Sequence, residues 1–455
     1  MPARGTVAVH SLGCKANREE MECLLSRLAE SGYRVVPFGQ AADWVVVNTC
    51  TVTLSGDSDS RQMIRRAAAS KGGGRLVVTG CMAQRDPATS ASIPGVDWVI
   101  GNGEKPRLAR WILGEDRPSR PAGSGAWVEV AADPTLSEFA LYGAGREGRR
   151  TRATLKVQDG CDEHCTFCVI PRVRGRSRSR PLEEVVREAR KLADGGYREI
   201  SLTGINTALW GRDLPGGPEL PDLCDALGTV DGCERIRLNS LEPQYLTAEW
   251  WERLAANPRI CPHFHLPLQS GEASILRRMN RAYTPALYAE VVRRIATQMP
   301  EAAIGCDILV GFPGESEEQF ESAFGFLSRL PLAYLHVFSY SPRPDTAALR
   351  LGPPVPVALR QERSLRLRNL DRELRRRFAA RQAGTVQAVL PEGPCGAGEW
   401  QGLTGNYLRV RFPWTPTASP AMPLVLLEET GNVRWMRGRP LAPRWEDGRG
   451  QRRGR

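Results

Sequence analysis

Residues 153–168 read ATLKVQDGCDEHCTFC, and this stretch decides the fold and the chemistry of the central part of the chain. Ala153–Val157 is predicted to be a β-strand, and three cysteines follow it with the spacing C-x3-C-x2-C: Cys161, Cys165 and Cys168. Three thiolates so close in sequence can converge on one metal centre, and soft sulfur ligands suit iron–sulfur clusters and zinc. Three ligands rather than four would leave one iron of a 4Fe–4S cluster open to a substrate.

A structural zinc site is the alternative interpretation of this loop. His164 could complete a Cys3His set around zinc. However, the adjacent residues His164 and Cys165 cannot easily both face one small ion. The loop also follows a barrel strand at the edge where barrel active sites lie, which a purely structural zinc site would not explain. The loop therefore favours a cluster over zinc.

The cysteine loop stands at the start of a long α/β series. Further strands are predicted, in chain order, at Glu199–Leu202, Arg235–Leu238, Phe264–Leu268, Ala303–Leu309 and Leu335–Phe338. Helical segments intervene, for example Pro181–Asp194, which has proline at a favourable first helical position. Six consecutive βα units predict an open, partial (β/α)6 barrel. A charged helix, Pro356–Ala380, is expected to close the series.

The N-terminal part of the chain is a separate α/β series. Strands are predicted at Val7–His10, Trp44–Val47, Arg75–Val78 and Asp97–Ile100. Helices are predicted at Asn17–Glu30 and Ser58–Ala69. Apolar strands that alternate with helices are typical of an open parallel α/β sheet.

Three cysteines of this N-terminal part share one position relative to the strands. Cys14, Cys50 and Cys81 each follow a predicted strand. The carboxyl ends of parallel strands lie at one edge of an open α/β sheet, where ligands bind, so these thiols can meet. A single free cysteine is most often a small buried residue, but three at equivalent strand ends predict a second three-thiolate centre. The other six show no such spacing and are interpreted as packing or unassigned residues: Cys23, Cys224, Cys233, Cys261, Cys306 and Cys395.

The remaining segments have a different character. Regular periodicity fades from about Gly114, where Pro, Gly, Ser and Arg accumulate, and a linker is placed at 114–148. Beyond Gly384 the chain offers short apolar pieces separated by Gly- and Pro-rich turns, which is the pattern of a small β-barrel. Strands are expected there, for example at Thr385–Leu390, Tyr407–Phe412, Pro423–Leu427 and Asn432–Met436.

Composition sets limits on the function. The chain has 455 residues, 41% of them hydrophobic and 25% charged, which is ordinary for a globular protein. No apolar run reaches the length of a membrane helix and no signal-peptide core precedes residue 14, so a cytoplasmic protein with no membrane partner is expected. In a reducing compartment the 12 cysteines should not form disulfides. The net charge of +11 fits either a nucleic-acid partner or a general basic bias with a solvated tail.

Blocks along nearly the whole chain resemble one known family, the radical-SAM methylthiotransferases. The resemblance rests on these segments, in the family's order: SLGCKANREEME (11–22), VVNTC (46–50), TGC (79–81), GCDEHCTFCVIPRVRGRSRSRP (160–181), SLTGIN (201–206), HLPLQSGEASILRRMNRAYT (265–284), DILVGFPGESEEQF (307–320) and HVFSYSPRPDT (336–346). GLTGNYLRVRF (402–412) resembles a TRAM domain, a small RNA-binding barrel. Ala16 departs from the pattern, because a larger aliphatic residue is expected after Lys15.

The resemblance implies the domain organisation and two 4Fe–4S clusters. Domains are expected at 4–113 (methylthiotransferase), 149–380 (radical SAM) and 381–443 (TRAM), followed by a basic tail at 444–455. Cys161, Cys165 and Cys168 would hold the radical-SAM cluster, whose open iron chelates S-adenosylmethionine (SAM). Cys14, Cys50 and Cys81 would hold an auxiliary cluster that carries the sulfur to be inserted. One SAM would methylate that sulfur, and a second would be cleaved to a radical that removes hydrogen from an unreactive C–H bond.

Candidate SAM contacts lie at or near strand ends. Thr203 and Gly204 could approach the methionine or ribose part, and Glu242 is a further candidate at or near a strand end. Gln269 and Asp307 could hydrogen-bond ribose or amino groups. A plain alternative for each is that it caps the following helix. Apart from His164, the histidines are interpreted as scattered residues, most of them on strands and facing the barrel interior or the core: His10, His263, His265 and His336.

The expected polyanionic partner is tRNA. Five arginines follow the cysteine loop at alternate positions and would contact RNA phosphates, although a solvated basic segment is the alternative: Arg172, Arg174, Arg176, Arg178 and Arg180. The resemblance also implies an electron donor such as flavodoxin or ferredoxin and a sulfur donor of unknown identity.

Three branches of the family differ in substrate. GCKAN at Cys14 and CTFCVIPRVRGRSRSR resemble most the branch that modifies threonylcarbamoyladenosine beside the tRNA anticodon. The other two act on isopentenyladenosine in tRNA and on an aspartate of a ribosomal protein. Two other classes stay open: a non-enzymatic iron–sulfur or zinc protein that binds RNA, and a radical-SAM methylase, which would not need Cys14, Cys50 and Cys81.

Overall fold

The computed structural model divides by its contacts into two compact units, Met1–Asp371 and Arg372–Arg455. The residues that it describes are 4–116, 125–135, 138–140, 151–396, 398–415, 422–432 and 434–441. Much of the expected linker at 114–148 and all of the expected basic tail at 444–455 lie outside the described residues.

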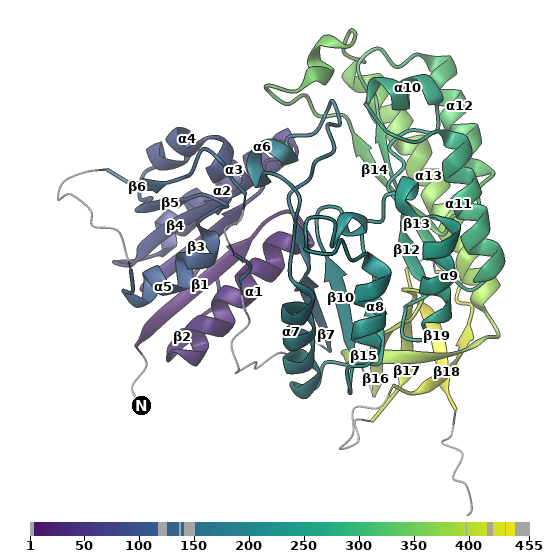
Figure 1. Ribbon diagram of the computed structural model, residues 1–455, viewed down its shortest axis with the longest axis horizontal. Helices are drawn as coiled ribbons and strands as arrows, with labels where there is room; N and C mark the ends of the chain where they lie inside the picture. Colours follow the sequence, from purple (N-terminus) through teal and green to yellow (C-terminus); the bar gives the residue numbers. More distant parts are fainter. Residues whose placement is uncertain are drawn as a thin grey trace, which may run out of the picture. The chain divides into compact units, whose positions relative to one another are not determined.

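The first unit begins with a six-stranded parallel sheet in the order β2-β1-β3-β4-β5-β6 (Figure 1). Its strands are β1 (Gly5–Ser11), β2 (Tyr33–Val35), β3 (Trp44–Thr49), β4 (Arg75–Gly80), β5 (Trp98–Ile100) and β6 (Trp127–Glu129). The two central strands, β3 and β4, are rich in valine and buried almost throughout, as strands between two helical layers are. The predicted open parallel sheet is confirmed.

Helices cover both faces of this sheet. They are α1 (Lys15–Glu30), α2 (Leu54–Ser70), α3 (Cys81–Arg85), α4 (Pro87–Ser92) and α5 (Leu108–Leu113). Apolar residues of α1 and α5 pack on one face, and those of α2 and α3 pack on the other. Strands β2 and β6 were not expected from the sequence. Each has three residues, too few to show a period, and β6 falls within the expected linker.

The central part of the first unit contains the expected partial barrel. Its six parallel strands are β7 (Arg152–Lys156), β10 (Glu199–Thr203), β11 (Arg235–Arg237), β12 (His263–His265), β13 (Ala303–Val310) and β14 (Tyr334–Ser339). They form two three-stranded sheets, β7-β10-β11 and β12-β13-β14, and an isolated parallel bridge joins Ile236 of β11 to Ile260, three residues before β12. The predicted central α/β barrel fold is therefore confirmed.

Helices follow the barrel strands, and the alternation along β13 shows which face they cover. The helices are α6 (Ile170–Arg174), α7 (Leu182–Asp194), α8 (Leu220–Gly228), α9 (Ala248–Ala256), α10 (Ala273–Arg278), α11 (Pro285–Gln298) and α12 (Glu317–Ser328). Cys306 of β13 is buried and interacts with Tyr288 of α11. Because successive residues of a strand point to opposite faces, the half-buried Asp307 faces the barrel interior. The cysteine loop follows β7 and is joined to it by β8 (Gln158–Asp159), which pairs with β9 (Arg178–Ser179).

The second unit is a closed five-stranded barrel in the order β15-β16-β17-β19-β18, which confirms the predicted small β-barrel. Helix α13 (Val357–Gln382) runs from the first unit into the second. The strands are β15 (Val386–Gly396), β16 (Glu399–Thr404), β17 (Arg409–Pro413), β18 (Leu424–Glu428) and β19 (Met436–Pro440).

One expectation for this barrel is wrong, and one strand was not foreseen. The predicted strand Asn432–Met436 is instead β19, which begins at Met436, and β16 at 399–404 was not among the strands named from the sequence. In β16 the buried residues are Gly402, Leu403 and Thr404, so it shows little apolar alternation. In β19, by contrast, Met436 and Gly438 face the core between arginines.

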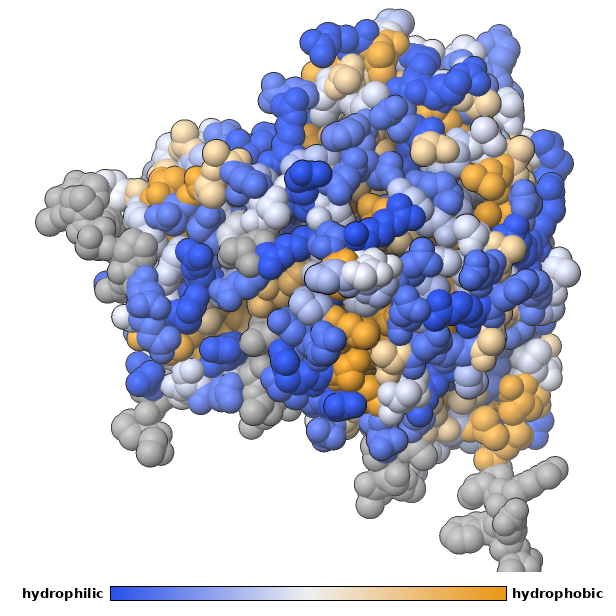
Figure 2. Space-filling view, viewed as in Figure 1, coloured by the Kyte–Doolittle hydropathy of each residue, from blue (hydrophilic) through white to orange (hydrophobic). Residues whose placement is uncertain are grey.

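The surface is mostly hydrophilic in the view of Figure 2, and apolar residues gather only in small separate patches. Among the described residues no helix has both the length and the apolar character that a membrane crossing requires.

Candidate functional site

The three-cysteine loop is held in place by its own backbone. The Cys161 N–H donates to the Gly175 carbonyl (3.1 Å), and the Cys168 N–H donates to the Cys165 carbonyl (3.0 Å). Gly160 adopts φ +70, and a Cβ there would lie 1.9 Å from the Arg176 carbonyl oxygen. Only glycine therefore allows the chain to turn into the loop at this point.

The sulfurs of the loop accept hydrogen bonds and lie beside a cavity. The N–H groups of Glu163 and Ile170 donate to the sulfurs of Cys161 and Cys168, each at 3.4 Å. Burial, together with the neighbouring cysteines, raises the pKa of Cys161 and Cys168 to about 12. A cavity of about 800 Å³ opens beside the loop and is lined by Cys161, His164 and residues of 132–134 and 171–176. Three thiolates would repel one another here, so the set requires a cationic centre to be stable as thiolates.

The ligand set around the thiols bears on the choice between a cluster and a single ion. Tetrahedral zinc with Zn–S bonds of about 2.3 Å brings its sulfurs to roughly 3.8 Å from one another. In the described part of the chain, only His265, Asp307 and His336 bring three ligand atoms within 4.8 Å of one another. Neither cysteine set is so tight, and His164 does not complete one. The all-thiol donor set, with no fourth ligand atom converging on it among the described residues, fits a multi-iron cluster better than zinc.

The N-terminal cysteines lie together at one edge of the first sheet. Cys14 precedes α1, Cys50 follows β3, and Cys81 begins α3 directly after β4. A Cβ on Gly13 would lie 2.9 Å from the Cys50 sulfur, so the turn at Gly13 packs directly against that thiol. Burial, with contributions from Cys81 and Cys14, raises the pKa of Cys50 to about 11. The structure thus brings together the three thiols predicted to share a centre.

A buried network of charged side chains links this edge to the barrel. Arg174 of α6 contacts Asp159 (2.7 Å) and Glu20 of α1 (3.1 Å). Lys156 of β7 lies 2.7 Å from Glu20, and Lys105 lies 2.6 Å from the same carboxylate. Burial would raise the pKa of Glu20, but the three cations together hold it well below its usual value. The network therefore fixes the start of α1, and with it Cys14, against the segment that follows the cysteine loop.

Burial of two arginines overturns one interpretation of the arginine run. The side chains of Arg174 and Arg180 are 1% and 0% exposed, so neither is available to RNA phosphates, and neither belongs to a solvated segment. Arg172 and Arg176 are 62% and 87% exposed and remain candidates. The alternate spacing of the arginines did not reveal which of them are buried. Glu20 and Asp159, the partners of Arg174, lie far away in sequence or on another element.

Substitution of Arg174 should destabilise the fold. Arg174→Met leaves Asp159 and Glu20 buried with fewer cations, and we expect the free energy of unfolding to fall by about 3 kcal/mol. Urea denaturation of the protein would measure it. Arg176→Met is the matched control and should change stability by less than about 0.5 kcal/mol, since its side chain is in solvent. Equal effects of the two substitutions would contradict the role assigned to the network.

The candidate SAM contacts divide into two groups. Thr203 is buried at the end of β10, and Gly204 packs against Gln158, whose Oε1 a Cβ at 204 would approach to 2.7 Å. Glu242 is paired with Arg281, which also donates from Nη1 to the Cys165 sulfur (3.0 Å). Burial raises the pKa of Glu242 to about 7, against the opposing effect of Arg281. Glu242 therefore lies next to the cysteine loop, and Arg281 is a neighbour of that loop that sequence reasoning missed.

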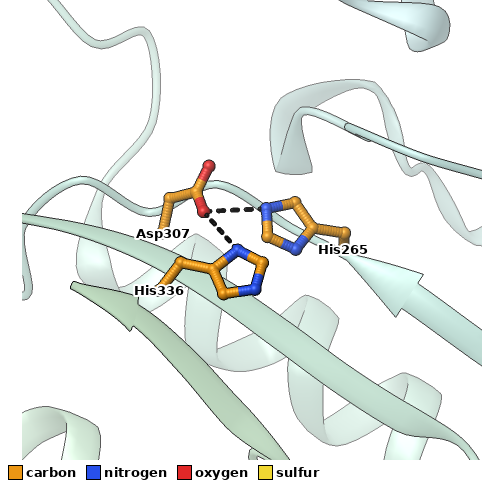
Figure 3. Close-up of side chains that lie close together, drawn as sticks. All are labelled: His265, Asp307 and His336. Atoms are coloured by element: carbon orange, nitrogen blue, oxygen red, sulfur yellow. Dashed lines mark hydrogen bonds and ion pairs between the residues drawn. The ribbon is translucent and has the colours of Figure 1, made fainter. Parts of the chain in front are cut away.

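The other two candidates, Gln269 and Asp307, lie side by side, since the segment that follows β12 runs along β13. Gln269 has φ +72, and its N–H donates to the Asp307 carbonyl (2.8 Å). The Asp307 carboxylate contacts His265 and His336 (Figure 3). Tyr334 contacts both His263 and His265 through its hydroxyl. The interpretation of these three histidines as scattered is wrong, because parallel pairing of β12, β13 and β14 brings them to one face.

Comparisons with known proteins agree with this arrangement. Residues 155–327 match the family described as "Radical SAM superfamily", and residues 6–101 match "Uncharacterized protein family UPF0004". The threonylcarbamoyladenosine tRNA methylthiotransferase MtaB of Bacillus subtilis (strain 168) is 38% identical over 90% of this chain and 91% of its own. The ribosomal protein uS12 methylthiotransferase RimO of Geobacter sulfurreducens (strain ATCC 51573 / DSM 12127 / PCA) is 34% identical over 86% of this chain and 87% of its own.

A solved structure shows the same fold. The radical S-adenosylmethionine methyltransferase TsrM from Kitasatospora setae, with cobalamin and a [4Fe-4S] cluster bound, superposes with a TM-score of 0.55. It is 18% identical, and the match covers 74% of this chain and 75% of that one. The fold and the cysteine loop define a radical-SAM enzyme, which implies SAM and a 4Fe–4S cluster. The chain belongs to the radical-SAM methylthiotransferase family.

Proposed function

We propose that this enzyme inserts a methylthio group at carbon 2 of the adenine in N6-threonylcarbamoyladenosine, next to the anticodon of tRNA. The observation that carries the proposal is the presence of two separate three-cysteine sets within one compact unit. One set lies beyond the carboxyl ends of strands of the N-terminal sheet, and the other lies in the loop that follows β7 and β8 of the barrel. A methylase that adds no sulfur would need only one set. The 38% identity to a relative named for threonylcarbamoyladenosine in tRNA supports this substrate over the other two branches. We propose that the enzyme acts on tRNA in the cytoplasm.

Each cysteine set has its own role in the proposal. Cys161, Cys165 and Cys168 would hold the 4Fe–4S cluster that supports reductive SAM cleavage, and Cys14, Cys50 and Cys81 would hold a second. Such clusters and SAM, when bound, supply the electron, the radical and the sulfur that no side chain can supply for an unreactive C–H bond. An electron donor such as flavodoxin or ferredoxin and an unidentified sulfur donor complete the reaction.

The side chains of the enzyme position the reactants. Arg281 orients the Cys165 sulfur and holds Glu242 beside it. Thr203, Gly204, Glu242, Gln269 and Asp307 are proposed to bind SAM. We propose that residues 4–113 and 149–380 carry the two cysteine sets and that residues 381–443 bind RNA.

The second unit carries a basic face that suits RNA. Arg409 and Arg411 of β17 alternate with buried Val410, and Arg411 pairs in register with Arg437 of the neighbouring strand β19. Arg439 follows on the same strand face as Arg437. The Arg411 guanidinium lies 4.6 Å from the Trp435 ring, which orients it. Phosphate contacts of this kind give affinity without sequence preference.

Removal of this face should weaken tRNA binding. We expect the double variant Arg409→Ala/Arg437→Ala to bind tRNA more weakly. The magnitude of the negative slope of log K against log salt should fall by about 1 to 2, because binding would then neutralise fewer phosphates and release fewer counterions. Fluorescence anisotropy with labelled tRNA over a salt series would measure both. Arg190→Ala on α7 is the control and should leave the slope unchanged. An unchanged slope in the double variant would exclude this face as the RNA contact.

A direct assay tests the proposed substrate. The enzyme with both clusters restored is incubated with SAM, reductant and a sulfide source. It is given anticodon stem-loops that contain threonylcarbamoyladenosine or isopentenyladenosine, or ribosomal protein uS12. Mass spectrometry should show the methylthio product only with the threonylcarbamoyladenosine stem-loop. Product only with isopentenyladenosine or only with uS12 would overturn the substrate while leaving the chemistry in place. SAM cleavage with no methylthio product from any of the three would overturn the reaction.

A further inference from the structure

Three side chains that face the barrel interior form a cluster apart from both cysteine sets. His265, Asp307 and His336 come from the adjacent strands β12, β13 and β14 (Figure 3). Nε2 of His265 lies 3.0 Å from Oδ1 of Asp307, and Nδ1 of His336 lies 3.2 Å from the same oxygen. Both rings thus point a nitrogen at one carboxylate oxygen.

The distances match the spacing of ligands around one small ion. Metal–nitrogen and metal–oxygen bonds of about 2.0–2.2 Å place neighbouring ligand atoms roughly 3 Å apart. Two imidazole nitrogens and one carboxylate oxygen are also the donor set that binds divalent first-row transition ions with coordination positions left open. Strand pairing produces the arrangement, because Asp307 is directly in register with His336, and His265 is in register with Gly305, two residues before Asp307.

A second layer of side chains holds the proposed ligands. Nδ1 of His265 lies 3.3 Å from the Tyr334 hydroxyl, which lies 3.0 Å from Nε2 of His263. A hydrogen-bonded partner on the second ring nitrogen is the usual support of a metal-binding histidine. Gly305 makes room for this layer, since a Cβ there would lie 2.0 Å from Cζ of Tyr334.

We propose that His265, Asp307 and His336 bind a divalent transition-metal ion. The side chains of His336 and Asp307 are 49% and 22% exposed, so the ion would be reached from the barrel interior and would exchange with solvent. The cysteine sets are not part of this site, because their sulfurs are not among the ligand atoms that converge there. Only Asp307 of the three is also a proposed SAM contact. The ion site is argued from the geometry of these three side chains alone and does not rest on the proposed function.

Manganese titration of the enzyme with both clusters in place tests the site. Free Mn²⁺ is measured by electron paramagnetic resonance while the clusters are in their silent resting state. The wild type should bind one Mn²⁺ per chain, and Zn²⁺ should displace it, as the usual order of metal affinities requires. Asp307→Asn and His336→Ala should each weaken binding by about 100-fold or more, whereas His10→Ala, on β1 beside Phe38, should not change it.

Cluster absorbance would verify that each variant is folded and loaded. As a second readout, Mn²⁺ should raise the Tm of the wild type but not that of Asp307→Asn. Absence of Mn²⁺ binding by the wild type would overturn the proposal, and Asp307 would then only accept hydrogen bonds from the two rings. Equal Mn²⁺ affinity of wild type and Asp307→Asn would overturn it too, because the ion would then be bound elsewhere.

Discussion

Cys165→Ala should abolish both SAM cleavage and methylthio product, with a loss of at least about 1,000-fold in the rate of 5′-deoxyadenosine formation. The substitution removes one of three thiols in the loop and the sulfur to which Arg281 donates. A set of two thiols cannot retain a three-cysteine cluster, and no side chain nearby could supply the missing chemistry. Chromatographic quantification of 5′-deoxyadenosine after anaerobic reduction measures the effect. The iron content should fall by about four atoms per chain if that cluster is lost.

Cys395→Ala is the matched control for Cys165→Ala. Cys395 is also half-buried, but it lies in β15 of the second unit and belongs to neither set. It should retain full iron content and full SAM cleavage. If Cys165→Ala still formed 5′-deoxyadenosine at a rate close to that of Cys395→Ala, the loop would not be the site of SAM cleavage.

Cys50→Ala should separate the two halves of the reaction. SAM cleavage should continue, because the loop at 161–168 is untouched, while sulfur insertion should fall below detection. Cys50 lies against the turn at Gly13 and contributes to the same group of thiols as Cys14 and Cys81. Mass spectrometry of the nucleoside product and quantification of 5′-deoxyadenosine from the same reaction measure both halves.

The control for Cys50→Ala is Cys23→Ala. Cys23 is a buried residue of α1, and its thiol donates to Glu19 rather than facing the N-terminal set. This control should keep both activities. Methylthio product from Cys50→Ala would show that Cys14, Cys50 and Cys81 do not hold the sulfur-inserting centre.

The sequence predicted most of the fold because its strands are long or strongly apolar. VVV at 45–47 and VV at 77–78 are unmistakable buried strands, and β13 has eight residues. Some short or polar strands were not predicted from the sequence. β2 and β6 have three residues each. β16 contains Gly402, which packs where any side chain would clash with the Leu390 carbonyl, and a glycine is not a typical sign of a strand.

The cysteine sets could be located from the sequence because each cysteine follows a strand, and parallel strand ends share an edge. The buried ion network could not be located from the sequence. Arg174 and Glu20 are 154 residues apart, and only the tertiary fold places them together. The interior histidines had a readable signal: His263 and His265 are two residues apart on one strand, as are Tyr334 and His336. The strand period alone places each pair on one face, but the order of strands was needed to join them with Asp307.

The central claim is tested most directly by mass spectrometry of nucleosides from total tRNA of cells with and without this gene. Loss of the 2-methylthio derivative of threonylcarbamoyladenosine, with the unthiolated nucleoside accumulating, is the predicted result. If that nucleoside is unchanged and the isopentenyladenosine derivative disappears instead, the substrate assignment is wrong but the reaction stands. If no tRNA nucleoside changes, tRNA is not the substrate, and the proposed function is contradicted.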